Sequence, residues 1–231
     1  MELMVGITIG LIVTAAASVV AVNQINEHRR LMLETQIQQD LRTAADLLQQ
    51  DLRRAGFRGN AELGVWAPPS GAGTLTQQDA QAASASQFAD MVKTESNAGR
   101  SLTYRYARRT TGDLRDFENF GFRWDRANKT LYLMIGLAGG QPNWQPITDP
   151  DAVKITEFNI YLDESQAVDV GDFCDRPCNP PTAGAPACPR HVVRQVRFKI
   201  DAEAAHDSRV KRTLTGVERL RADKITGACP A

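Results

Sequence analysis

The chain opens with a long run of apolar positions that carries no charge. Leu3 to Val22 is uncharged and predominantly apolar, and the next charged residue is Glu27. Twenty residues of α-helix rise about 30 Å, which is the thickness of the hydrocarbon core of a membrane. The run therefore predicts a transmembrane segment over residues 3–22. Glu2 lies at one end of this segment, where an ionisable side chain is a candidate functional group because it needs a partner in lipid.

The apolar positions then follow a helical period without interruption. Spacings of three and four residues place one stripe on a single helix face. The stripe consists of Leu33, Ile37, Leu41, Ala44, Leu48 and Leu52. The first proline is Pro68, and Gly56 closely follows two arginines, a pattern typical of a helix C-terminus. The sequence predicts one helix from Glu2 to about Arg54, with two helices meeting near Asn23 as the alternative.

After Gly99 the period shortens to two. Alternating apolar and polar side chains predict half-buried strands near residues 102–106, 120–124, 131–135, 155–163, 194–202 and 210–220. The second and third of these strands form a predicted hairpin. Residues 60–99 are rich in small and polar side chains, which predicts an irregular crossing with a short helix near residues 87–94. One apolar face per strand favours an antiparallel sheet of about four to seven strands, covered by the helix stripe.

These patterns together predict an α+β fold with two parts. Residues 1–54 form the N-terminal helix, whose first half spans the membrane. Residues 55–231 form an antiparallel β-sheet domain outside the membrane, periplasmic or extracellular, with a cysteine-containing C-terminal region.

Charge and composition narrow the function classes. Lys and Arg together number 27, as do Asp and Glu, so no basic excess indicates a nucleic-acid partner. The sequence contains neither a glycine-rich nucleotide-binding motif nor an HExxH pair. The histidines His28, His191 and His206 lie in polar or proline-rich surroundings, without a nucleophile in a recognisable setting. We therefore expect a protein that is not an enzyme and has no cofactor.

The four cysteines indicate an oxidising compartment. Cys174, Cys178 and Cys188 crowd one loop, and Cys229 lies two residues from the end. An even number of cysteines in an exported chain predicts disulfides, and three connectivities are open. We expect Cys229 to hold the C-terminal strand to this loop, with the remaining two cysteines closing a short loop there. The alternative is a zinc site formed by the three loop cysteines and His191.

An acidic cluster lies between the predicted strand at 155–163 and the cysteines. Its members are Asp163, Glu164, Asp169, Asp172 and Asp175. Carboxylate oxygens suit calcium, but the spacing does not match the ligand positions of an EF-hand. The prediction is a solvated acidic loop, with a calcium site as the alternative.

The segment Glu2-Leu3-Met4-Val5 resembles the N-terminus of type IV pilins and of the pseudopilins of type II secretion. In those families a basic leader ends in glycine and is followed by phenylalanine and by a segment that contains this glutamate. Here Met1 lies directly before Glu2, so we expect a longer precursor that a prepilin peptidase cuts. The resemblance implies a pilin-like fold, and it implies that Glu2 pairs with the N-terminal amine of an adjacent subunit during assembly.

The end of the predicted helix resembles that of the PilW-type minor pilins. Their D-L-R-x-A-G-[YF]-x-G phrase matches Asp51 to Gly59, in which Gly56 ends the helix and Phe57 is expected to dock on the following domain. The resemblance implies a minor pilin that joins other minor pilins and the major pilin, primes type IV pilus assembly and sits at the pilus tip. Such a pilus serves motility, adhesion or uptake. Before assembly the protein would be a single-pass protein of the inner membrane with its C-terminal domain in the periplasm.

Two alternatives remain open at this stage. A J-like minor pseudopilin of a type II secretion system has a similar helix end and relies on the same physical chemistry. A membrane-anchored periplasmic binding protein or enzyme would use the helix only as an anchor, and an anchor has no use for Glu2.

Overall fold

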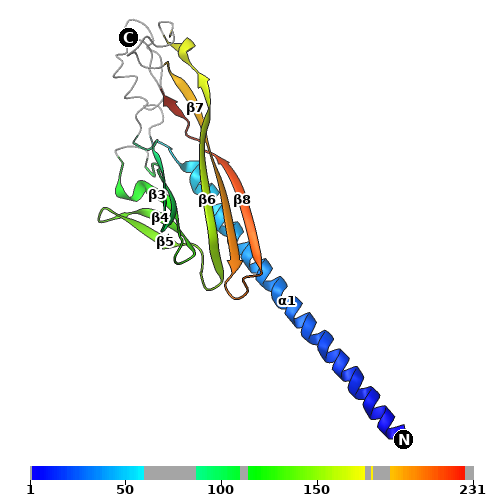
Figure 1. The fold of residues 1–231 in the computed structure, drawn as a ribbon. Helices are drawn as coiled ribbons and strands as arrows, with labels where there is room; N and C mark the ends of the chain where they lie inside the picture. Colours follow the sequence, from blue (N-terminus) through cyan, green and yellow to red (C-terminus); the bar gives the residue numbers. More distant parts are fainter. Residues whose placement is uncertain (1, 60–86, 110–113, 175–177, 179–187, 227–231) are drawn as a thin grey trace.

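A computed structural model describes residues 2–59, 87–109, 114–174, 178 and 188–226. Within these ranges the chain forms one long α-helix, two antiparallel sheets and two short 3₁₀ turns, η2 (Asp116–Glu118) and η3 (Gly171–Phe173). The helix projects far beyond the sheets at the N-terminal end (Figure 1). The fold is α+β and pilin-like, as the sequence predicts.

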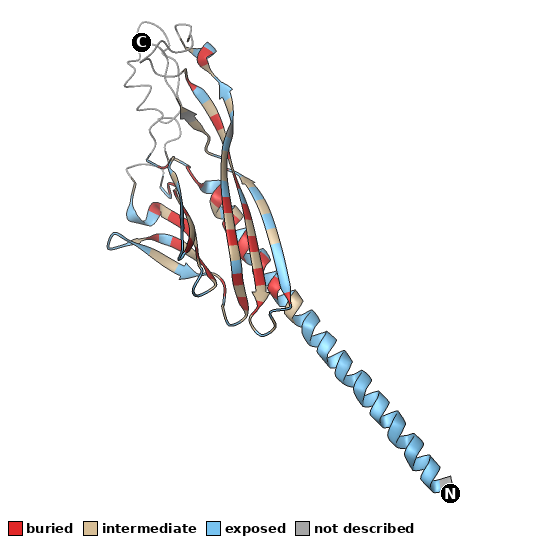
Figure 2. Ribbon diagram, in the orientation of Figure 1, coloured by how far each residue is buried: buried red, intermediate tan, exposed pale blue. Residues whose placement is uncertain are grey.

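Helix α1 (Glu2–Arg54) is a single helix of 53 residues. Its first half lies outside the domain, and its second half packs on the sheets through one buried stripe (Figure 2). The buried stripe contains Ile37, Leu41, Ala44, Ala45, Leu48 and Leu52. The helix ends where Gly56 takes a positive φ of 80°, a conformation that glycine adopts without steric cost. The alternative of two helices meeting near Asn23 is wrong, because the helix runs through that position without a break.

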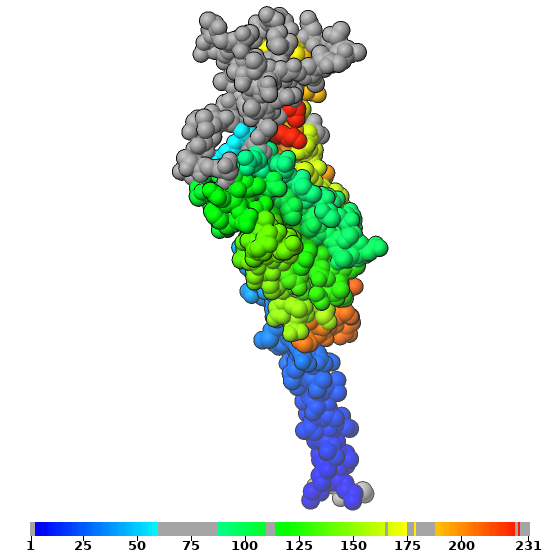
Figure 3. All heavy atoms as spheres, turned by 90° about the vertical axis from the view of Figure 1, so that its left-hand side faces the viewer, coloured from blue at the N-terminus to red at the C-terminus, as the bar shows by residue number. Residues whose placement is uncertain are grey.

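The first sheet is an antiparallel meander in the order β1-β2-β3-β4-β5. Its strands are β1 (Met91–Ser96), β2 (Gly99–Arg105), β3 (Asn119–Asp125), β4 (Thr130–Ala138) and β5 (Gln141–Pro146). The predicted hairpin is β3 with β4, where Phe122 pairs with Leu133 and Trp124 with Leu131. One face of this sheet lies in the core, and the opposite face forms the side of the molecule turned toward the viewer in Figure 3.

The second sheet is built on a long hairpin of β6 (Val153–Asp169) and β7 (Arg190–Ala204). Strand β8 (Lys211–Arg219) and the short β9 (Lys224–Thr226) both pair antiparallel with β7. Helix α1 packs against β7 and β8. The C-terminal end of β6 at Asp169 and the start of β7 at Arg190 lie at the end of the hairpin distant from the projecting helix (Figure 1).

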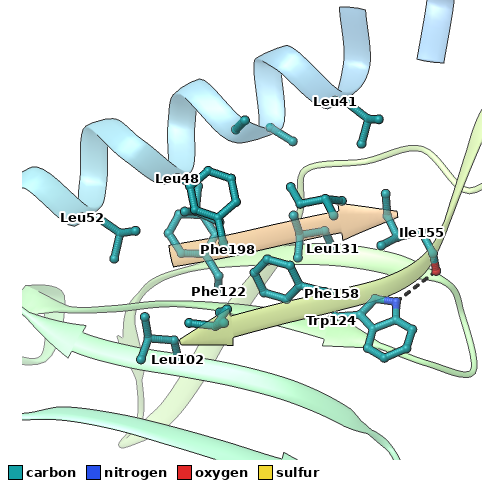
Figure 4. Close-up of a cluster of buried hydrophobic side chains, with 14 of the residues drawn as sticks. Leu41, Leu48, Leu52, Leu102, Phe122, Trp124, Leu131, Ile155, Phe158 and Phe198 are labelled. Carbon is teal, nitrogen blue, oxygen red and sulfur yellow. Dashed lines mark hydrogen bonds between the residues drawn. The ribbon is translucent and has the colours of Figure 1, made fainter. Parts of the chain in front are cut away.

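The core lies between α1 and the two sheets. In Figure 4, Leu48 and Leu52 of the helix face Phe198 of β7, and Phe122 and Leu102 of the first sheet close the cluster from below. All five side chains are almost completely buried. The alternation that was visible in the sequence thus places one apolar face of each sheet toward a shared interior.

Two expectations about the strands are wrong. The sequence predicts one sheet, but the strands form two, because β5 and β6 do not pair and β6 pairs with β7 instead. The short helix expected near residues 87–94 does not form, since β1 begins at Met91. Strand β1 has mostly exposed side chains and is held by backbone pairing with β2, so it carries little alternation that a sequence pattern would reveal.

Candidate assembly surface

The projecting half of α1 is an apolar rod without protein around it. Every side chain from Leu3 to Met32 is exposed, including all of the large apolar ones (Figure 2). An 18-residue window of this helix has a mean hydropathy of 2.4, and none of the window is buried. By length and composition α1 is therefore able to span a membrane. The transmembrane segment expected at residues 3–22 lies within this half.

The hydroxyl groups of the rod are satisfied within the helix itself. Thr8 donates to the carbonyl of Met4 at 3.0 Å, and Ser18 donates to the carbonyl of Thr14 at 2.8 Å. Thr14 in turn donates to Gly10 at 3.0 Å. Because a hydroxyl without a partner is costly in an apolar medium, these bonds fit the rod to lipid or to a protein core.

Glu2 is the first residue of α1, but its side chain lies outside the described part of the chain. Its pairing with an adjacent subunit therefore stays a prediction. Its position places it at the end of the rod that is farthest from the domain (Figure 1).

Two ion pairs fasten the second half of α1 to β8. Glu34 pairs with Arg212 near the start of the strand. Arg53 binds Glu218 near its end through two hydrogen bonds of 2.8 and 3.2 Å. The acid is on the helix in the first pair and on the strand in the second, so a shift of the helix along β8 would separate both pairs. Glu34 and Arg53 lie outside the apolar stripe of the helix, and the sequence pattern did not reveal these partners.

Asp51 links α1 to the first sheet. Its carboxylate accepts hydrogen bonds from the hydroxyl groups of Tyr104 at 3.3 Å and Tyr106 at 3.5 Å. Burial raises the pKa of Asp51 above its ordinary value, and the two tyrosine hydroxyls and Arg54 only partly oppose this rise. Burial, followed by the charge of Asp51, raises the pKa of Tyr104 as well. Asp51 and the two tyrosines therefore form a polar contact between α1 and the first sheet, where the packing is otherwise apolar.

The helix end is held by backbone contacts and by one buried arginine. The Gly56 N–H donates to the carbonyl of Arg105 at 2.8 Å. A Cβ at Gly56 would lie 2.8 Å from a guanidinium nitrogen of Arg194, so glycine is needed here for space as well as for its φ angle. Phe57 was expected to dock, but its side chain is 51% exposed, and it is the Phe57 carbonyl that accepts a hydrogen bond from Ala107.

Arg194 is the largest fully buried side chain, and it joins three separate segments. It is 1% exposed and donates to the carbonyls of Ala89 at 2.6 Å and Ala222 at 2.7 Å. Burial lowers the pKa of this guanidinium. The sequence carried a signal for this residue, because Arg194 shares the strand parity of Val196 and therefore lies on the apolar face of β7.

The cysteines form disulfides. Cys178 is bonded to Cys188, and the Cα atoms of the two residues are 5.7 Å apart. Cys174 is also disulfide-bonded, and none of the described cysteines is free. Cys229 lies outside the described residues. The zinc alternative is wrong, because its three cysteines are oxidised and their sulfur atoms are not available as thiolate ligands.

The described members of the acidic cluster lie apart from one another. Asp163 accepts a hydrogen bond from Gln195, Glu164 lies 3.9 Å from Lys224, and Asp169 caps the backbone N–H of Gly171. Asp172 is exposed on η3, and Asp175 lies outside the described residues. No group of three or more metal-ligating side chains occurs in the part of the chain that the structure describes. Asp163, Glu164 and Asp169 all lie on the extended strand β6, so they are spread along its length.

The histidines likewise lie apart from one another. His28 is exposed on α1 and His206 is exposed beyond the end of β7. His191 on β7 lies 3.2 Å from Asp223.

An open cleft of about 470 Å³ lies where the first sheet meets the base of the second. Its lining includes Trp124 and Arg126 from the first sheet and Glu157 and Asp201 from the second. Both acids already have partners, since Glu157 lies 3.4 Å from Arg100 and Asp201 lies 2.8 Å from Lys199. Of these two ion pairs, the one between Arg100 and Glu157 connects the two sheets, and the one between Lys199 and Asp201 lies within β7.

Comparison with known proteins identifies one family. A family model described as "Prepilin peptidase-dependent protein B" matches residues 30–220, which include the docked half of α1 and the strands of both sheets up to the end of β8. A search of curated proteins and a search of solved structures find no match.

Proposed function

The chain belongs to the prepilin peptidase-dependent protein B family and is a pilin-related protein, and from this premise we propose that it is a non-catalytic minor pilin. In this proposal it joins other minor pilins in the inner membrane, primes the assembly of a type IV pilus and occupies the pilus tip. The major pilin then adds beneath it. A prepilin peptidase processes it, in keeping with the description of its family.

One observation carries the proposal: a single helix combines an exposed apolar half with a half that is docked in the domain. An anchor alone requires only the apolar half. The helix is continuous, and ion pairs fix it to the domain at both ends of β8. The rod and the domain therefore keep a fixed position relative to each other. A filament subunit needs this property, because its neighbours contact both parts.

The chemistry of the rod explains why a carboxylate at its end is useful. When the rod leaves lipid for a filament core, its surroundings stay apolar, so the hydrophobic effect provides little net drive. Specific polar pairing must then choose the alignment between subunits. An unpaired carboxylate is costly in such surroundings, whereas Glu2 paired with the N-terminal amine of a neighbour is favoured.

The test compares Glu2→Ala with a matched control on the same helix, Glu27→Ala, in a strain that expresses each variant from the natural gene. We expect both variants to insert in the membrane and to fold. The Glu2 variant should recover less of the other minor pilins on purification and should assemble fewer surface pili. Equal recovery and equal piliation in the two variants would favour the anchored-protein alternative.

The same experiment separates pilus from secretion function. A J-like pseudopilin would co-purify with pseudopilins, and its Glu2 variant would impair protein secretion while leaving surface pili unchanged. We expect the reverse pattern.

A further inference from the structure

The outer face of the first sheet carries an arginine held between two aromatic rings. The guanidinium carbon of Arg123 on β3 lies 5.0 Å from the ring centre of Tyr132 on β4 and 4.9 Å from that of Trp144 on β5. Phe122 and Trp124 point into the core, so Arg123 between them points outward by the alternation of the strand. Strands β3, β4 and β5 lie on the side of the molecule that faces the viewer in Figure 3.

A buried apolar side chain lies on the same face of the sheet as these rings. Met134 pairs with Trp144 in the sheet register and is only 3% exposed, although it shares the outward parity of Tyr132. Gly121, its partner on the other side, has no room for a side chain, since a Cβ there would lie 2.7 Å from the Leu102 carbonyl oxygen. We call Arg123, Tyr132, Met134 and Trp144 the arginine–aromatic patch. Trp144 therefore lies opposite a buried apolar residue on the same face of the sheet.

Arg123 has no acceptor for its charge among the described residues. In the described part of the chain no hydrogen bond or ion pair reaches its guanidinium, and its Nε is buried without a partner. Some arginines near the sheets do have an acid partner, as Arg100 has Glu95 and Arg212 has Glu34. Burying part of a cation without an acceptor costs free energy, and that cost is offset when a carboxylate binds the remaining donors.

The surroundings of Arg123 limit what binds there. Its neighbour on β2 is Ser101, and the next outward position on that strand is Thr103. The acid at the next outward position on β3, Asp125, binds Ala127 and Asn128 of the turn, so the patch presents one cation without a paired acid. A nucleic acid or another polyanion is held by several cations in a row. One cation with Trp and Tyr is instead the composition of an energetic centre in a protein–protein interface.

We propose that the arginine–aromatic patch is the docking site for another protein subunit, which presents an acidic side chain from within an apolar surface. The carboxylate binds Arg123, and the apolar residues around it cover Tyr132 and Trp144. This inference rests on the proposed function, because it assigns one contact between this chain and its assembly partner.

The experiment uses the full chain in cells. A photo-crosslinking amino acid replaces Thr103 beside the patch, and in a control it replaces Thr215, which is exposed on β8. We expect the probe at residue 103 to form an adduct with one protein of the assembly and the probe at residue 215 not to form that adduct. Mass spectrometry of the adduct identifies the partner surface.

Charge variants then test the chemistry. Arg123→Glu should lower recovery of that partner at least about tenfold, as expected for a central interface arginine. Arg123→Lys keeps the charge but loses the stacked planar group and should give a smaller loss. The matched control is Arg197→Glu, since Arg197 also lies over a ring, that of Tyr161, on the second sheet. An acid-to-lysine change in the partner should restore binding to Arg123→Glu.

The melting temperature of each variant shows whether it is folded. If Arg123→Glu is folded and recovers the partner as well as the wild type does, the inference is wrong. It is also wrong if the probe at residue 103 labels only polysaccharide. If Glu2→Ala loses the partner while Arg123→Glu does not, the proposed function holds and this docking site fails.

Discussion

The indole N–H of Trp124 on β3 donates a buried hydrogen bond of 3.0 Å to the backbone carbonyl of Ile155 on β6 (Figure 4). The N–H of Ile155 also bonds to the first sheet, through the carbonyl of Lys129 at 2.8 Å. Both groups point away from β7, next to a shift in the β6–β7 register between Ile155 and Glu157. The two sheets are not paired strand to strand, and they are connected here because the N–H and C=O of Ile155 on β6 are free to bond to the first sheet.

Replacing Trp124 with phenylalanine should destabilise the domain. The change leaves the buried carbonyl of Ile155 without a donor, which costs about 1–3 kcal/mol in the free energy of unfolding. Thermal unfolding of the full chain in detergent, followed by circular dichroism, measures the loss. Trp144→Phe is the control, because the described chain offers its indole N–H no acceptor, and it should cost less. Equal losses would show that ring volume rather than the hydrogen bond matters.

Two adjacent leucines of α1 should respond very differently to truncation. Leu48 is 1% exposed against the sheets, whereas Leu47 is 38% exposed on the other side of the helix. Leu48→Ala removes buried contacts and leaves a cavity, so we expect a loss of about 2–5 kcal/mol. Leu47→Ala should change stability by about 0.5 kcal/mol or less in either direction. Denaturant unfolding of the two variants provides the comparison, and similar midpoints would contradict the docked arrangement.

Gly216 on β8 should not tolerate a side chain. A Cβ at this position would lie 2.2 Å from the ring of Phe198, which is buried against the helix. Gly216→Ala should therefore displace the ring and cost about 1–3 kcal/mol of stability. Thr215→Ala, on the exposed face of the same strand, is the matched control. A neutral result for Gly216→Ala would mean that Phe198 has room to move.

Asp51 should make the stability of the domain depend on pH. Because burial raises its pKa, the folded chain holds the Asp51 proton at pH values where the unfolded chain has lost it. Stability from this group therefore falls as pH rises through the raised pKa and returns as pH is lowered. Asp51→Asn keeps an oxygen for the two tyrosine hydroxyls but does not titrate.

The difference in melting temperature between wild type and Asp51→Asn measures this effect. It should shift in favour of the wild type as the pH is lowered from neutral toward the ordinary carboxyl pKa. Asp46→Asn, exposed on the same helix, serves as the control. A constant difference across this range would contradict the predicted titration.

The cysteine loop should yield two linked peptide pairs. Cys178 is bonded to Cys188, and Cys174 is bonded as well. The prediction from the sequence, in which Cys229 holds the C-terminal strand to this loop, gives Cys174 and Cys229 as the second pair. Proteolytic mapping of the purified full chain without reductant should recover both pairs and no free thiol. Replacing Cys178 and Cys188 with serine should cost about 2–4 kcal/mol, because the unfolded chain regains the freedom of the closed loop. Recovery of a Cys229 peptide with an alkylated thiol would contradict the second pair.

The sequence by itself determined the local elements of this protein. The boundaries of α1 and the positions of the longer strands agree with the predicted ones, because periods of 3.6 and two residues are properties of neighbouring positions in the chain. The apolar rod also followed from sequence, since its length and lack of charge need no tertiary context. Strands β1 and β5 were missed because edge strands with mostly exposed or partly exposed side chains show little alternation.

Only the tertiary structure decided which elements share a sheet and which polar groups meet. Phe122 and Phe198 have the same alternating surroundings in the sequence, yet they belong to different sheets. Asp51 and Tyr104 are 53 residues apart, and Arg123 and Trp144 lie on different strands of the meander. Such pairs are long-range contacts, and tertiary packing brings them together through many weak interactions. The periodicity of neighbouring residues carries no information about these interactions.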